Sequence, residues 1–481
     1  KDFQQLAIIK ELVIQNQSLY ENISKIEVIT TPPSKYEAQG NSGLINIILK
    51  KNPNLGFSGN ITSGLNQRTY HNGSSNGTLN YQTEKLSLSL KTNYIEGAKR
   101  SNERYNILGK SQNYSESTRK DMWRDLTPSL NLSYKMNKNS EIGMEYIFGN
   151  DHSGMDILNT TQNIAPDLTE KNLITNTFHR EKSPTHTFST YYDLKLDSIG
   201  KKLSIASNFY RNDNNTEVNF STLTLPENTI QEVKTLSQIK PQIFSVQADL
   251  ELPFSFGTIE TGTKFTQFKN SADLKYFNLE NNQYIIDEEK GSIFHYQEEN
   301  YAAYARLSKN IGEHWETKAG LRYENTVVKS SAKNFTYGQW FPSAYLSYKQ
   351  KKNVFSASYS RRINRPSMSN LNPFRWYENP YSYSTGNPLL TPSYINNYEI
   401  SYTYNNKLSS SIYYVRLKNA FGQVSTLDGL SQNSNYLNHY NNNFYGVNLS
   451  YTDTFFKFWE ATASFNASYH TSEVFNINAE T

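Results

Sequence analysis

The sequence predicts an all-β fold, a large antiparallel transmembrane β-barrel. From Gly56 onward, apolar and polar residues alternate with a period of two, which is typical of strands with one apolar and one polar face. Short turns alternate with long connections, which is the asymmetry of large membrane barrels. No run approaches the ~18 apolar residues that a membrane-spanning helix needs, whereas a spanning strand needs only ~10 residues.

The alternation assigns residues to the two faces of the barrel wall, over roughly 18–21 segments of the length expected of a spanning strand. The residues predicted to face lipid are Leu130, Leu132, Ile142, Met144, Val246, Leu321, Ile400 and Ala463. Those predicted to face a polar lumen are Asn131, Glu145, Asp249, Arg322 and Glu399. Turns such as Lys349–Asn353 and Asn405–Lys407 are short, and connections such as Ile107–Arg124 and Arg362–Ile395 are long. The long connections are expected on the outer side of the membrane.

The composition is compatible with a membrane barrel. Only 36% of the 481 residues are hydrophobic, and the mean hydropathy is −0.71. A barrel strand turns only every second residue to lipid, so its average hydropathy is low. Aromatic residues make up 14%, including 36 tyrosines, which suits interfacial aromatic girdles. A soluble Tyr- and Asn-rich β protein fits the composition equally well, but it does not so readily give long strands with every second residue polar.

Several classes of chemistry find no support in the sequence. It has no cysteine, so disulfides and cysteine ligands are excluded. The net charge of +4 is too balanced to suggest nucleic acid as a partner. The eight histidines are scattered, and no G-x-S-x-G motif occurs. Gly109-Lys110-Ser111 resembles the end of a phosphate loop, but the required earlier glycine is Arg104. We therefore expect no catalysis, no bound metal and no cofactor.

The N-terminal part has a different character. Residues 1–17 are predicted to form a helix, and Ser18 with Glu21 fits a capping box for a short second one. Lys25–Thr31 and Leu44–Leu49 are predicted strands, joined by a Pro- and Gly-rich connection. The pattern changes near Asn52–Gly56. We therefore predict one domain at residues 1–54 and the barrel at residues 55–481.

One connection stands out as a binding surface. The stretch Arg361–Tyr398 combines five prolines, several arginines and many aromatic residues. Proline stiffens a loop, and exposed aromatic rings give contact area at low entropic cost. The alternative is that these residues fold the loop back into the lumen and pack it. The candidate ligand-binding residues are Phe374, Arg375, Trp376, Tyr377, Tyr381 and Tyr383.

The sequence IEVITTPPSKYEAQGNSGLINIILKK resembles the end of the plug domain of TonB-dependent outer-membrane receptors. That family has an I-E-V-I strand there, then P-S-x-Y-x-A-x-G and G-x-I-N-I-x-x-K. The positions that carry the motif here include Ile26, Glu27, Val28, Tyr36, Gly40, Gly43 and Asn46. The segment Ser358–Tyr404, with its R-P, L-N-P-F and G-N-P-x-L-x-P pieces, is similar to a late-barrel segment of the same family.

The resemblance implies a barrel of the 22-stranded type with the end of the plug inside its lumen. It also implies a location in the outer membrane of a Gram-negative bacterium. Residues 1–54 correspond to the C-terminal part of the plug, and the last barrel strands are expected to be missing from this chain. The implied partners are outer-membrane lipid, TonB through an N-terminal segment that the sequence does not show, and a SusD-like or other surface lipoprotein.

The implied function is import of a solute. Ligand would bind the extracellular loops and the plug, and TonB would then move the plug at the expense of the proton gradient. Two alternatives stay open: a non-transporting barrel subunit or scaffold of an outer-membrane complex, and a soluble adhesive β protein. The sequence does not identify the ligand.

Overall fold

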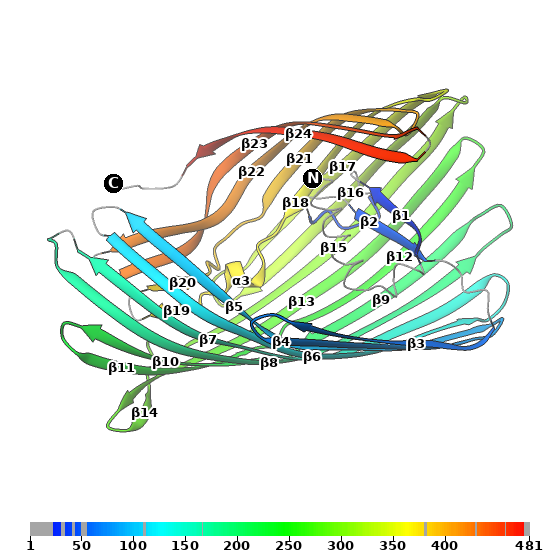
Figure 1. The fold of residues 1–481 in the computed structure, drawn as a ribbon. Helices are drawn as coiled ribbons and strands as arrows, with labels where there is room; N and C mark the ends of the chain where they lie inside the picture. Colours follow the sequence, from blue (N-terminus) through cyan, green and yellow to red (C-terminus); the bar gives the residue numbers. More distant parts are fainter. Residues whose placement is uncertain are drawn as a thin grey trace.

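The computed structural model describes residues 23–29, 34–40, 44–49, 55–108, 112–165, 167–379, 382–428, 431–456 and 458–475. One sheet of 22 strands, antiparallel except where β20 pairs with β23, curves around a central space (Figure 1). Its first half contains β3 (Gly56–Gln67), β4 (His71–Gln82), β5 (Leu86–Leu108), β6 (Gln112–Lys135), β7 (Ser140–Ile164), β8 (Glu170–Lys195), β9 (Lys202–Asn212), β10 (Asn214–Leu225), β11 (Thr229–Ile239), β12 (Gln242–Phe254) and β13 (Gly257–Glu280). Its second half contains β14 (Gln283–Ile286), β15 (Ser292–Ile311), β16 (Trp315–Ser330), β17 (Phe335–Gln350), β18 (Asn353–Asn364), β19 (Trp376–Asn379), β20 (Ser382–Thr385), β21 (Ser393–Tyr404), β22 (Leu408–Asp428), β23 (Ser431–Phe455) and β24 (Trp459–Val474).

The 22 strands make fewer crossings of the wall than their number suggests. Strands β9 and β10 together pair along β8, and β11 and β12 together pair along β13, so each couple forms one pass. Strands β14, β19 and β20 belong to connections. This leaves 17 passes in the described part of the chain, slightly below the predicted range of segments.

The two ends of the wall differ as the sequence predicts. At one end the turns are short, such as those between β17 and β18 and between β21 and β22. The other end carries long hairpins and the connection 365–392, and we take it as the extracellular end. Within the described residues, no helix is long and apolar enough to cross a membrane.

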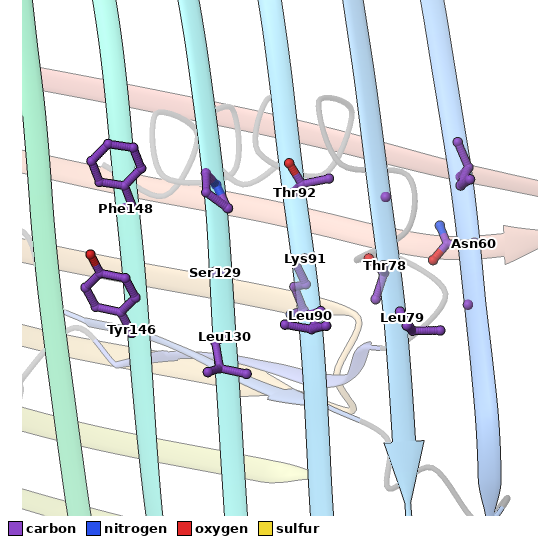
Figure 2. Close-up of a pocket in the computed structure, with 14 residues that line it drawn as sticks. Asn60, Thr78, Leu79, Leu90, Lys91, Thr92, Ser129, Leu130, Tyr146 and Phe148 are labelled. Atoms are coloured by element: carbon purple, nitrogen blue, oxygen red, sulfur yellow. The ribbon is translucent and has the colours of Figure 1, made fainter.

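The predicted two faces of the wall are confirmed. Ile142, Val246, Leu321 and Ile400 are exposed on the outer face, while Arg322, next to Leu321, is only 2% exposed on the lumenal face. Leu79, Leu90, Leu130 and Tyr146 are cross-strand partners on four consecutive strands and form one outward row (Figure 2). A surface that exposes such a row to water would be costly, so this face suits the acyl chains of lipid.

Aromatic residues gather in two bands on the outer face. Near the short turns, Trp315 packs on Tyr348 and Phe355 packs on Tyr402, each with ring centroids 4.7 Å apart. Farther toward the extracellular end, Tyr323 packs on Trp340 at the same distance. Aromatic bands at two levels of an outer wall are typical of the two membrane interfaces.

Two predicted loops are shorter than expected. The prediction of a long loop at Ile107–Arg124 is wrong, because β5 and β6 continue their pairing up to Leu108 and Gln112. Ion pairs across the two strands, Arg104–Glu116 at 2.5 Å and Arg119–Glu103 at 2.9 Å, accompany this extension. The connection predicted at Arg362–Ile395 covers only 365–392, because strand pairing continues to Asn364 and restarts at Ser393.

The two strands predicted near the N-terminus form a separate small sheet. Strand β1 (Ile23–Ile29) pairs antiparallel with β2 (Leu44–Leu49), and Glu27 lies opposite Asn46. Figure 1 draws this sheet between the walls of the large one. The predicted helix at residues 1–17, the capping box at Ser18 and Glu21, and Gly43 lie outside the described residues. The division at residue 54 stays a prediction.

The orientation of the wall predicts which tryptophans meet lipid. Trp315 and Trp340 lie on the outer face, and Trp123 lies on the lumenal face, where its ring covers Gly97. In single-tryptophan variants reconstituted in bilayers, lipids brominated near the headgroup should quench Trp315 and Trp340 strongly and Trp123 weakly. Equal quenching of all three would contradict the assignment of faces.

Candidate functional site

The segment 34–40, between the two strands of the small sheet, lies directly on the lumenal wall. Gln39 forms an isolated parallel bridge with Ile363 of β18. The N–H of Ile363 donates to the carbonyl of Ala38 at 3.0 Å, and the N–H of Gly40 donates to the carbonyl of Ile363 at 3.1 Å. Gly40 has a φ of 108°, which a residue with a side chain rarely adopts. The two stretches that carry the family resemblance therefore contact each other, although more than 300 residues separate them.

A buried carboxylate anchors this contact. Glu324 of β16 is 1% exposed, and it accepts a hydrogen bond from the N–H of Ala38 at 3.3 Å. Its two oxygens also pair with Arg322 at 2.6 Å and with Arg365 at 2.8 Å. A single buried charge of this kind would be very costly, but two guanidinium groups compensate it here.

Arg365, the first residue after β18, joins the network to the extracellular connection. Its guanidinium also donates to the hydroxyl of Tyr337 at 3.1 Å and faces Glu298 at 3.5 Å. Burial alone lowers the pKa of Arg365, but the neighbouring Tyr337, Glu324 and Glu298 raise that pKa overall. Arg365 therefore remains a cation at any pH relevant to a cell.

Further cations of the wall reach the backbone of the segment. Arg322 donates to the carbonyl of Ser34 at 3.5 Å, and Arg362 donates to the carbonyl of Glu37 at 3.3 Å. Lys264 of β13 forms an ion pair with the Glu37 side chain at 2.5 Å. Most of the attachment is thus polar, and hydrogen bonds to water are of similar strength to these contacts.

Close packing adds a small apolar and steric component. Ala38 packs with Phe341 and Ile363 in a buried cluster. Ser34 lies over Gly320 of β16, where a Cβ atom on Gly320 would stand only 2.0 Å from the Ser34 hydroxyl. The same hydroxyl is 3.1 Å from that of Ser343. The absence of a side chain at Gly320 is what allows this approach.

The connection 365–392 folds back over the lumen and packs there. It contains the short helix α3 (Met368–Leu371), whose Leu371 joins Leu390 in a buried cluster with the wall residues Phe294 and Val328. Phe374 packs against the same cluster. The packing of the loop into the lumen, which the sequence left open, is thus observed for Phe374. Its ring packs the loop onto the wall.

The other candidate ligand residues are distributed around β19 and β20. Trp376 is 49% exposed. Arg375 stacks its guanidinium over the Tyr383 ring, 4.8 Å from the centroid, so it is not the isolated cation that the sequence suggested. Tyr377 lies opposite Tyr383 in the β19–β20 pair. Tyr381 lies outside the described residues.

Between this loop and the wall is a cavity of about 440 Å³. Phe374, Arg375 and Trp376 line it from the loop. Most of the remaining lining residues carry hydroxyl, amide or imidazole groups: His179, Asn214, Thr216, Thr235, Ser237, Ser369, Asn372, Ser384, Thr385 and Gln423. A pocket of this size with aromatic and hydrogen-bonding groups can hold a small polar solute.

The alternation placed Arg322 and Glu324 on the same lumenal face, but sequence reasoning did not predict that they form an ion pair or that Arg362 and Arg365 join them around segment 34–40. Which lumenal charges meet the segment 34–40 depends on barrel closure, and a strand pattern does not contain this information. No group of three or more metal-ligating side chains occurs in the part of the chain that the structure describes.

A larger hollow, about 790 Å³, lies on the outer wall. Gly59, Ile61 and Gly77 are among its lining residues. Leu90 and Phe148 also line it (Figure 2). This hollow faces lipid, so it is no candidate for a water-borne solute.

Comparison with known proteins identifies the kind of barrel. A search of curated proteins finds no match. Among solved structures, the chain is similar to the copper transporter OprC, with a TM-score of 0.58 and 11% identity over 92% of this chain and 66% of that one. It is also similar to a mutant of the ferric enterobactin receptor PfeA from Pseudomonas aeruginosa, with a TM-score of 0.58 and 15% identity over 93% of this chain and 67% of that one. The RagAB peptide transporter matches with a TM-score of 0.50 and 13% identity, over 84% of this chain and 51% of that one.

At such low identity these likenesses establish the fold, which is that of large outer-membrane receptors, and the chain spans only part of their length. The sequence itself gives the family. Residues 194–481 match the model of the outer membrane protein beta-barrel family, and this is more than half of the chain. The protein therefore belongs to the outer membrane protein beta-barrel family and resides in the outer membrane of a Gram-negative bacterium.

Proposed function

We propose that this protein is an energy-coupled outer-membrane receptor that imports a solute. The solute binds in the cavity under the connection 365–392, and force from TonB then moves the plug away from the wall. The observation that carries the proposal is the polar attachment of segment 34–40 to Glu324, Arg322, Arg362 and Lys264.

The attachment is compatible with movement. Most of its contacts are polar, and water can replace these partners once the segment moves. A dry apolar interface of the same size would resist a pull far more, because each Å² of apolar surface exposed costs ~25 cal/mol. The network is also connected to the ligand cavity, because Arg365 begins the loop that carries Phe374 and Trp376.

The cavity favours a neutral or weakly charged polar solute. Its acidic residue Glu181 accepts a short hydrogen bond from Asn214, and its basic residue Arg375 stacks on Tyr383. The many hydroxyl and amide groups suit a ligand rich in hydrogen-bonding groups, and Trp376 offers a flat apolar face. A lipoprotein lid of the SusD type over the extracellular end is compatible with this arrangement and is part of the proposal.

A disulfide lock tests the plug movement. The hydroxyls of Ser34 and Ser343 are 3.1 Å apart, so paired cysteines can approach the ~2 Å bond length of a disulfide. Mass spectrometry of the medium identifies the solutes that wild-type cells remove. Cells that carry Ser34→Cys/Ser343→Cys should fail to remove these solutes after oxidation. A reductant should restore depletion. The matched control is Ser356→Cys/Ser401→Cys, whose hydroxyls are 2.6 Å apart on two wall strands, and it should transport normally.

Normal uptake by the oxidised lock would show that segment 34–40 stays on the wall during transport. Equal depletion by wild-type cells and by cells without the protein would instead favour the scaffold alternative.

Gly320 provides a test of how the segment is seated. Gly320→Ala inserts a methyl group into the space of the Ser34 hydroxyl, and overpacking of this kind costs ~1–3 kcal/mol. The closed-state current in planar bilayers should therefore rise. Gly149→Ala is the control, because a Cβ atom there meets nothing closer than 3.4 Å. A wild-type current in Gly320→Ala would mean that the seating does not depend on this glycine.

The two aromatic residues of the loop should separate binding from stability. Trp376→Ala should weaken binding of the solute that co-purifies with the wild type by ~5- to 150-fold, with an unchanged melting temperature. Phe374→Ala should lower the melting temperature, because its ring packs on the buried cluster. Unchanged affinity in Trp376→Ala would move the binding site away from this loop.

A further inference from the structure

The outer wall carries a charged groove above the aromatic band, outside the cavity and the plug contact. The groove has a volume of about 560 Å³ and is lined by residues of β7, β8, β10, β11 and β13. Four of its lining residues are basic: His152, Arg180, Lys182 and Lys275. It lies on a face that the proposed transport does not use.

The period of two places these side chains on the outer face. His152 lies six residues beyond the outward-facing Tyr146 on β7, and Lys182 is the cross-strand partner of His152. On β13, Lys275 lies between Leu274 and Tyr276, which are both buried toward the inside. The exposed basic groups therefore point to whatever surrounds the barrel at this height.

The height is fixed by the aromatic band below. Tyr146 and Phe148 of β7 point outward (Figure 2), and Tyr146 pairs with Phe188 of β8. Four residues separate Phe148 from His152. With a rise of ~3.3 Å per residue and a strand tilt of ~40°, the groove stands ~10 Å above the aromatic band. Aromatic bands mark the boundary of the hydrocarbon layer, so the groove lies at the level of lipid headgroups.

The charges of the groove are only partly compensated within the protein. Arg180 pairs with Asp156 at 2.7 Å, and Glu217 pairs with Lys234 at 2.8 Å. In the part of the chain that the structure describes, neither Lys182 nor Lys275 has a carboxylate within 4.0 Å. Asp273 also lines the groove and offsets one positive charge. Lys182 and Lys275 are therefore available to an external anion.

We propose that this groove binds the phosphate groups of a phosphorylated glycolipid in the outer leaflet of the membrane. Lysine ammonium groups above a membrane boundary attract anionic headgroups. The apolar wall below, with Tyr146 and Phe148, receives the acyl chains of the same lipid. A water-soluble anion would gain from the lysines but not from this wall, so the combination selects a lipid.

The test measures lipid binding to the purified full chain in detergent. The probes are a bis-phosphorylated diglucosamine lipid (lipid A), the same lipid without phosphates, and inorganic phosphate. The variant is Lys182→Gln/Lys275→Gln. The matched control is Lys138→Gln/Lys352→Gln, which removes two exposed lysines at the opposite, short-turn end. Binding is followed by native mass spectrometry and by the shift of the melting temperature.

We expect the wild type and the control to bind the phosphorylated lipid equally, and Lys182→Gln/Lys275→Gln to bind it ~10- to 30-fold more weakly. The dephosphorylated lipid should bind wild type and variant alike. Equal binding of the phosphorylated lipid by the variant would overturn the proposal. So would equal affinity of the wild type for both lipids, or full displacement of the lipid by millimolar inorganic phosphate.

Discussion

The carboxylate of Glu324 holds together the parts of this molecule that sequence keeps apart. It lies on the lumenal face of β16 and is almost completely buried. It binds the backbone of segment 34–40 at Ala38, a neighbour on its own strand at Arg322, and the start of the connection 365–392 at Arg365. Removal of one partner from a buried ion cluster of this kind costs ~3–5 kcal/mol, because the remaining charges lose their compensation.

The constraint behind this arrangement is the two-sided environment of the wall. Every second residue must suit lipid, and the alternate residues must suit water or the plug. The outer face meets its requirement with rows of leucine, isoleucine and aromatic rings. The lumenal face can therefore carry Arg322, Glu324 and Lys264 without exposing a charge to lipid. The contacts of segment 34–40 with this face are mostly polar, which is compatible with the movement proposed for it.

The connection 365–392 shows the packing role, and the binding role stays a proposal. Its Leu371, Phe374 and Leu390 pack on the inner wall, and this packing fixes the loop over the lumen. Trp376 remains half exposed beside the cavity. A loop that is already packed loses less entropy than a free loop when a ligand binds, so this packing is compatible with the proposed binding site.

The sequence by itself determined the barrel and the direction of its side chains, and it predicted the two short strands β1 and β2 before the barrel. The period of two suffices because strand geometry forces neighbouring residues to opposite faces. The tertiary structure decided which lumenal charges meet the plug, since Lys264, Glu324 and Arg362 come from three different strands. It also decided that the stretch after Ile107 continues as a hairpin and that Arg375 stacks on Tyr383. These outcomes depend on distances between residues far apart in the chain, and a local pattern of apolar and polar residues does not encode such distances.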